Sequence, residues 1–308
     1  MSELKIIMYH YVREIKNSKF PDIKGLEVSA FRRQLDYFAK NHSFVTGEQV
    51  VLASKGKESL PDNSVWLTFD DGYKDHHSFV MPELIQRGIQ GTFFVPSKPV
   101  LERTVLDVNS IHYILASGAP ISAILERLNS VALGLGYSTR DLGEFRKKFS
   151  VKGRFDSPDV VYFKRMLQHA LPAPARHAVT DALLKEFVNL ERLELAESLY
   201  LSIQEVHDLV SAGMYVGGHG HEHLWMEKES YESQLSEINH SLRFLSEVGA
   251  SDTDWLMAYP YGSFNEDTKK ILSHLSCKAA VTTEVRAADL KSDDLLALPR
   301  FDTNDFPS

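Results

Sequence analysis

The sequence predicts an α/β fold in which parallel strands alternate with helices. Six short apolar runs, rich in β-branched and aromatic residues, are predicted strands at residues 5–9, 65–69, 91–95, 214–217, 255–259 and 278–282. Helical periodicity lies between them, for example at Phe31, Leu35 and Phe38. This alternating order is typical of a parallel sheet whose strands are joined by crossover helices.

One long stretch interrupts the alternation. The chain from Ser97 to Met214 is far longer than the roughly 30 residues of an ordinary strand-helix unit in a barrel. Most of it has helical periodicity, as at Ile124, Leu125 and Leu128. We therefore expect a single barrel domain over residues 1–308 that carries a helical insertion at about residues 101–200.

Composition narrows the class of partner and the compartment. The 308 residues are 43% hydrophobic, enough for a large core, and the formal net charge is −8. An acidic chain has no general basic face, so neither nucleic acid nor an anionic membrane is an expected partner. No run approaches the ~20 apolar residues of a membrane span, and the N-terminus lacks a signal-like apolar segment. With a single cysteine, Cys277, these features favour the cytoplasm.

The strongest chemical signal is the apolar strand at 65–69, which ends in Asp70, Asp71 and Gly72. In a parallel barrel the C-terminal ends of the strands form the active-site edge. Adjacent side chains point in different directions, so one carboxylate can bind a metal while the other faces a water. Asp-Asp-Gly is a common turn on its own, but a strand without polar alternation before it favours a functional site.

A second cluster follows the strand at 214–217. His219 and His223 are four residues apart among glycines, and His221 lies between them. About 0.5 such pairs are expected by chance in this sequence, so the spacing alone is weak evidence for a metal site. The position of the pair at a strand end is the stronger evidence. With Asp71 the two histidines make a facial ligand set that leaves sites for water and substrate. Such a set suits Zn²⁺ best, with Co²⁺, Fe²⁺, Mn²⁺ or Ni²⁺ as alternatives.

A third cluster, Tyr259-Pro260-Tyr261-Gly262, follows the strand at 255–259. It could be an ordinary exit turn. Alternatively, a backbone N–H in it could stabilise an oxyanion.

With these three clusters the sequence resembles the polysaccharide deacetylases, the carbohydrate esterase family 4-like group that shares the NodB homology domain. The match is in order as well as content: Thr-Phe-Asp-Asp-Gly at 68–72, then the histidine pair, then Tyr-Pro-Tyr-Gly at 259–262. A five-residue string such as the first is expected by chance in about one of 10⁴ chains of this size.

The resemblance implies a distorted, TIM-like (β/α)₇ barrel and a metal-dependent hydrolase that removes an N-acetyl group from an amino sugar. It also implies that Asp70 is the general base and that the backbone N–H of Tyr261 holds the oxyanion. The metal ligands that it implies are Asp71, His219 and His223.

Two departures from the family pattern point to substitutes. Ala258 stands where the family often has an arginine, and no histidine follows His274 to act as the usual general acid. Because a barrel closes its first strand against its last, we hypothesise that His10 protonates the leaving amine and that Arg300 orients Asp70. The alternative for His10 is a core histidine.

The leading hypothesis is therefore a carbohydrate N-deacetylase acting in cytoplasmic steps of bacterial surface polysaccharide biosynthesis. A basic run at residues 146–154 could bind the pyrophosphate of a nucleotide- or lipid-linked sugar, although such runs are usually solvated faces. One alternative is a deformylase or cyclic-imide hydrolase with the same site. Another is a catalytically degenerate barrel that binds a glycan without turnover.

Overall fold

The structure is a computed structural model that describes residues 3–153 and 156–308. The chain divides into two compact units. The barrel unit comprises Met1–Glu14, Gly25–Arg103 and Glu197–Ser308. The helical unit comprises Ile15–Lys24 and Thr104–Ala196, so a short segment near the N-terminus joins the helices that follow the third predicted strand.

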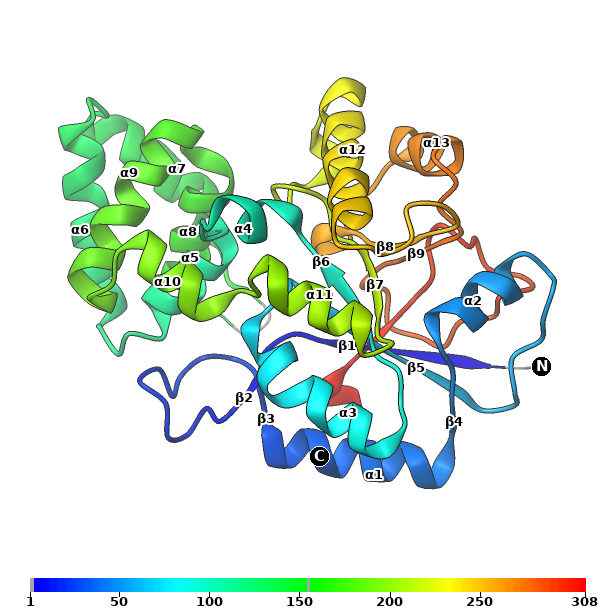
Figure 1. Ribbon diagram of the computed structural model, residues 1–308. Helices are drawn as coiled ribbons and strands as arrows, with labels where there is room; N and C mark the ends of the chain where they lie inside the picture. Colours follow the sequence, from blue (N-terminus) through cyan, green and yellow to red (C-terminus); the bar gives the residue numbers. More distant parts are fainter. Residues whose placement is uncertain (1–2, 154–155) are drawn as a thin grey trace. The chain divides into compact units, whose positions relative to one another are not determined.

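The barrel unit is built on a curled parallel sheet with the strand order β10-β1-β5-β6-β7-β8-β9, and β4 also pairs with β5 (Figure 1). The strands are β1 (Leu4–Tyr9), β4 (Ser43–Phe44), β5 (Ser64–Asp70), β6 (Thr92–Val95), β7 (Tyr215–Gly218), β8 (Leu256–Ala258), β9 (Ala279–Val281) and β10 (Phe301–Asp302). A separate two-stranded pair is formed by β2 (Val12–Arg13) and β3 (Leu26–Glu27). All six predicted strands are present, and the fold is the predicted α/β class with the parallel, curled sheet of a distorted (β/α)₇ barrel.

Helices connect these strands and form most of the helical unit. In the barrel unit they are α1 (Val28–Asn41), α2 (Gly47–Ser54), α3 (Met81–Arg87), α4 (Ser97–Glu102), α11 (Ile203–Ser211), α12 (Tyr231–Glu247) and α13 (Glu266–His274). Between β6 and β7 the chain also forms α5 (Asp107–Leu115), α6 (Ile121–Gly134), α7 (Thr139–Phe149), α8 (Pro158–Arg165), α9 (Ala173–Leu183) and α10 (Arg192–Leu199). None of the helices in the described ranges has both the length and the hydropathy needed to cross a membrane.

Strand β5 is buried on both faces, which explains its continuous apolar sequence. Its residues Val65, Leu67 and Phe69 belong to the core cluster that includes Phe31 of α1. Alternate residues point to opposite faces of a sheet, and Trp66 accordingly lies in a second core cluster. Asp70 shares the face of Trp66, so its carboxylate is directed to the interior side of the sheet.

The two ends of the sheet are brought together by the segment before β10. Leu298 pairs with Val281 of β9, and Phe301 pairs with Ile7 of β1. Within a few residues the chain therefore crosses from β9, at one end of the sheet, to β10 and β1 at the other end. Arg300 lies in this crossing and is 1% exposed.

In the helical unit, the segment Ile15–Lys24 is held by contacts with residues far along the chain. The ring of Phe20 packs edge-on against Tyr113, with centroids 4.9 Å apart. The ammonium of Lys19 donates to the carbonyl oxygen of Val188 at 3.3 Å. This segment has no apolar periodicity of its own, so the expected insertion at about residues 101–200 did not include it.

Candidate active site

The acidic and histidine clusters lie at the C-terminal ends of neighbouring strands. Asp70 is the last residue of β5 and pairs with Phe94 of β6, and Val95 of β6 pairs with Gly218 of β7. His219 follows Gly218 directly. Since the carboxyl ends of parallel strands meet at one edge, the acidic and histidine clusters are brought to the same place.

Asp71, His219 and His223 form a compact buried set. The Oδ1 atom of Asp71 lies 3.3 Å from Nε2 of His219 and 3.3 Å from Nε2 of His223. Their potential ligand atoms all lie within 4.8 Å of one another, and no other group in the described part of the chain meets this criterion. Asp71 and His223 adopt left-handed backbone conformations, with φ of 72° and 58°. Such conformations cost of order 1–3 kcal/mol each and tend to cluster at functional sites.

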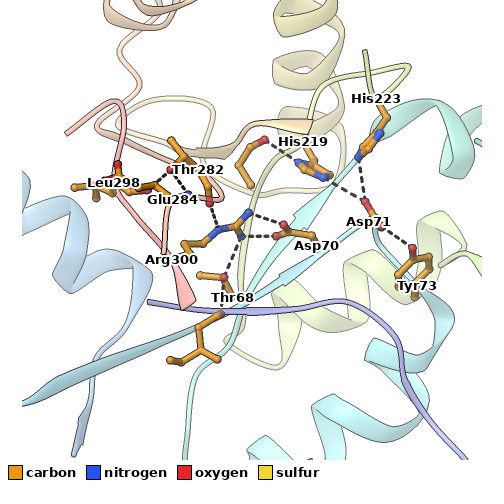
Figure 2. A network of polar contacts seen from close by, with 12 residues as sticks. Thr68, Asp70, Asp71, Tyr73, His219, His223, Thr282, Glu284, Leu298 and Arg300 are labelled. Atoms are coloured by element: carbon orange, nitrogen blue, oxygen red, sulfur yellow. Dashed lines mark hydrogen bonds and ion pairs between the residues drawn. The ribbon is translucent and has the colours of Figure 1, made fainter. Parts of the chain in front are cut away.

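Two of the three side chains are oriented by further hydrogen bonds. The hydroxyl of Tyr73 donates to Oδ2 of Asp71 at 2.5 Å, and Nδ1 of His219 lies 2.7 Å from the carbonyl oxygen of Ala258 (Figure 2). A carbonyl can only accept, so the proton of His219 is on Nδ1 and its Nε2 lone pair is available to a metal.

The remaining atoms fit a divalent cation. Oδ1 of Asp71 is buried and accepts no hydrogen bond from any described residue. A buried carboxylate oxygen without a donor is costly unless a cation satisfies it. One carboxylate oxygen with two imidazole nitrogens is a donor set that suits zinc and neighbouring transition metals. These residues therefore could hold a metal ion.

The charge states agree with this geometry. Burial by itself would raise the pKa of Asp71, but the imidazoles of His219 and His223 hold that pKa well below its usual value. Burial and the charge of Asp71 raise the pKa of Tyr73 well above its usual range. Asp71 is thus an ionised acceptor and Tyr73 a protonated donor at neutral pH.

Asp70 forms a buried bidentate ion pair with Arg300 (Figure 2). Nη1 of Arg300 donates to Oδ1 at 2.8 Å and Nη2 donates to Oδ2 at 2.7 Å. The guanidinium is itself fixed, because Nε donates to the carbonyl oxygen of Thr282 at 2.8 Å and Nη1 also contacts the hydroxyl of Thr68 at 3.2 Å. Burial opposes ionisation of Asp70, but Arg300 and His219 hold its pKa below the usual value.

His10 follows β1 and is half-buried at the same edge of the sheet. Its positive charge, when present, lowers the pKa of both Asp70 and Asp71. Its backbone carbonyl oxygen lies 3.0 Å from Nε2 of the buried His76, which holds this part of the chain in place. The structure thus brings His10 near both carboxylates.

Tyr261 lies in the tight turn Pro260–Gly262 that follows β8, with φ of 59°. Its ring centroid is 4.6 Å from that of His223, and its ring also stacks parallel on Trp225 with centroids 4.2 Å apart. The third sequence cluster is therefore beside the proposed ligand set.

His221, between the two proposed ligands, is turned to other partners. Its Nδ1 is 2.9 Å from the hydroxyl of Ser97, and its ring stacks on His240 with centroids 4.7 Å apart. His221 therefore has its polar and ring contacts outside the proposed ligand set.

The sequence did not single out Tyr73 and Glu237, which the structure places next to this set. In the sequence, the only indication of a role for Tyr73 was its position directly after the Asp-Asp-Gly turn. Oε2 of Glu237 accepts hydrogen bonds from the backbone N–H groups of His221 and Glu222, both at 2.9 Å. Glu237 stands beside Ile238 on the apolar face of its helix, and a carboxylate at such a position was the signal that could have identified it.

Structural comparison finds deacetylases of similar fold. A Streptococcus pyogenes deacetylase, PplD, solved with acetate, is 17% identical with a TM-score of 0.61, covering 97% of this chain and 92% of that chain. A de-N-acetylase from Aggregatibacter actinomycetemcomitans is 13% identical with a TM-score of 0.57, covering 98% and 95%. IcaB from Ammonifex degensii is 16% identical with a TM-score of 0.55, covering 97% and 91%. These similarities confirm the fold.

Sequence comparison identifies the family. A search of curated protein sequences finds no significant match. The family model for polysaccharide deacetylases matches residues 57–122 and 184–280, slightly more than half of the chain. The matched segments contain all three sequence clusters, whereas His10 and Arg300 lie outside them. The chain therefore belongs to the polysaccharide deacetylase family.

Proposed function

We propose that this protein is a metal-dependent carbohydrate N-deacetylase that hydrolyses the N-acetyl group of an amino sugar. The observation that carries the proposal is the buried set of Asp71, His219 and His223 immediately beside the ion-paired carboxylate of Asp70. Family membership and the fold shared with proteins described as deacetylases support the same reaction class.

Asp71, His219 and His223 would hold the metal, with Zn²⁺ the first choice and Co²⁺, Fe²⁺, Mn²⁺ or Ni²⁺ as alternatives. When bound, such an ion polarises an amide carbonyl and lowers the pKa of water toward ~7. Three protein ligands do not fill the coordination shell of such an ion, so further positions would be available to water and substrate.

Asp70 is proposed as the general base that takes a proton from the attacking water. Its pairing with Arg300 keeps it ionised and fixes the plane of the carboxylate. Each carboxylate oxygen retains a second lone pair, so the bidentate pair does not prevent proton acceptance. A carboxylate that is held in one orientation needs no reorganisation at the moment of reaction.

His10 is proposed as the general acid that protonates the leaving amine, and the backbone N–H of Tyr261 as an oxyanion donor. The support for His10 is its place at the end of β1, near Asp70 and Asp71. The support for Tyr261 is the contact of its ring with His223. Neither residue depends on the helical unit, which we propose is an insertion within one barrel domain.

The substrate is proposed to be an N-acetylated sugar used in cytoplasmic steps of bacterial surface polysaccharide assembly. The acidic composition and the single buried thiol, Cys277, are compatible with a reducing compartment. In the basic run, Arg146 is paired with Asp159, and Arg154 lies outside the described residues. Lys147, Lys148 and Lys152 are exposed and would be the residues that contact a nucleotide or lipid pyrophosphate.

Loss of catalysis is the main competing possibility, and the site argues against it. A barrel that only binds a glycan has no need of an ionised base beside a metal set. Here Asp70, Asp71, His219 and His223 are all retained, and Arg300 pairs with Asp70 although Ala258 carries no guanidinium.

The test is acyl release by the wild type and Asp70→Asn, together with elemental analysis of both proteins. N-acetylated oligosaccharides, nucleotide-sugars and lipid-linked sugars are the first substrates, and N-formyl sugars and cyclic imides follow. We expect stoichiometric metal in both proteins and acetate release that falls sharply in Asp70→Asn. Release of formate alone, or bound metal without hydrolysis of any amide substrate, would contradict the N-deacetylase assignment.

A further inference from the structure

The three proposed metal ligands are not held in the same way. Asp71 is fixed by the hydroxyl of Tyr73, and His219 by the carbonyl of Ala258. Nδ1 of His223 is buried and has no hydrogen-bond partner among the described residues. The orientation of His223 must therefore come from its backbone and from the packing of its ring with Tyr261 and His219.

The backbone before His223 is held on two sides. On one side, the first N–H groups of α4 donate to the loop: Ser97 N–H to the carbonyl of Gly220 at 3.2 Å, and Lys98 N–H to that of His221 at 3.1 Å. On the other side, Oε2 of Glu237 accepts the N–H groups of His221 and Glu222, each at 2.9 Å.

Glu237 is an unusual residue for this task. It lies on α12, which contacts β7 (Figure 1), and it is only 5% exposed. No salt bridge joins it to any described residue, and Lys98 and His240 act on its charge only at longer range. Burying a carboxylate without a direct cationic partner is costly. Oε2 also packs against Gly220, where a Cβ atom would come within 3.2 Å, and Gly220 has φ of 71°. A side chain at Gly220 would therefore crowd the carboxylate.

We propose that Glu237 is a positioning residue for the metal site, which fixes the loop at residues 220–222 and thereby the ring of His223. This inference rests on the proposed metal-dependent function. Tyr73 and Ala258 orient Asp71 and His219 by direct hydrogen bonds. Glu237 would orient His223 indirectly, by fixing the backbone of the loop. The carboxylate itself does not touch the metal or the substrate.

The first test is Zn²⁺ affinity, measured by chelator competition on metal-free proteins. Loss of an outer hydrogen-bonding partner typically weakens metal binding about 10- to 100-fold, and we expect this for Glu237→Ala. Glu237→Gln should rescue most of the affinity, because an amide oxygen can still accept both N–H groups. Glu232→Ala, on an exposed position of the same helix, is the matched control and should bind as the wild type does.

Two further measurements separate a positioning role from general stability. The visible absorption spectrum of the Co²⁺-loaded protein should change in Glu237→Ala and be restored in Glu237→Gln, because it reports ligand geometry. In the metal-free wild type, the amide protons of His221 and Glu222 should exchange slowly. This last measurement needs no variant and remains decisive if Glu237→Ala does not fold.

The outcomes distinguish this inference from the function on which it rests. A wild type that binds no Zn²⁺ overturns the proposed metal site, and the inference with it. A wild type that binds Zn²⁺, with Glu237→Ala binding equally well or with fast exchange at His221 and Glu222, overturns the inference alone.

Discussion

Arg300 and Asp70 form a buried bidentate ion pair although 230 residues separate them along the chain. The pair is possible because the segment around Arg300 crosses from β9 to β1, which is the strand next to β5. The guanidinium thus reaches the proposed base from the residue just before β10, while position 258 at the end of β8 is an alanine.

Removing Arg300 should destabilise the protein as well as inactivate it. Arg300→Leu leaves the Asp70 charge buried without a partner, and breaking such a pair typically costs about 3–5 kcal/mol of unfolding free energy. Urea denaturation of the wild type and the variant measures this difference.

The control for this prediction is the double variant Arg300→Leu/Asp70→Leu. Because no uncompensated charge remains, it should recover most of the lost stability while staying inactive. If Arg300→Leu alone were as stable as the wild type, the ion pair would not be the buried interaction described here.

The sequence predicted the position of this pair because buried parallel strands leave a clear pattern. The apolar run of β5 ends abruptly at Asp70, and barrel closure places the last strand beside the first. Strand β10 itself was not predicted, since it consists only of Phe301–Asp302 and both residues are partly exposed. Two residues are too few to show periodicity.

Tyr73→Phe should weaken metal binding with little effect on folding. The change removes only the hydroxyl that donates to Oδ2 of Asp71, so the carboxylate can rotate away from the two imidazoles. We expect Zn²⁺ affinity to fall about 10- to 100-fold in chelator competition.

Tyr259→Phe is the matched control for Tyr73→Phe. It also removes one buried tyrosine hydroxyl, which donates to the carbonyl of Leu296 at 2.7 Å. Equal losses of Zn²⁺ affinity in the two variants would argue against a specific role for the Tyr73 hydroxyl.

His10→Gln should reduce turnover without reducing metal affinity. General acid catalysis typically contributes 10²- to 10⁴-fold, so kcat for acetate release should fall by about that factor. The exposed His274 provides a control variant, His274→Gln, which should be as active as the wild type. Full turnover by His10→Gln would leave His10 as a structural histidine.

His76 should make the protein sensitive to acid. Burial lowers its pKa from 6.5 to about 4, so between these values the unfolded chain binds a proton that the folded state excludes. Its contribution to stability is therefore lost as the pH falls from 6.5 toward 4, at a cost of about 3 kcal/mol. His76→Gln should show a smaller loss of unfolding free energy between pH 7 and pH 4. If the unfolding free energies of the wild type and His76→Gln fell equally between pH 7 and pH 4, His76 would not be the source of the acid sensitivity.

The sequence alone did not reveal the roles of Tyr73 and Glu237. Their roles depend on contacts with Asp71 and with the backbone of His221 and Glu222, which only the folded chain brings together. Likewise, Ile15–Lys24 joins the helical unit through partners that are distant in sequence. Local patterns reveal which strand ends carry chemistry, but not which remote side chains orient it.

The central claim is that the set of Asp71, His219 and His223 makes this protein a metal-dependent N-deacetylase. The most direct measurement is acetate release from an N-acetylated amino-sugar oligosaccharide by metal-stripped protein titrated with Zn²⁺. The account predicts negligible release before addition and a rate that rises to a plateau at one equivalent of bound ion. A stripped protein that releases acetate as fast as the reloaded one would contradict it.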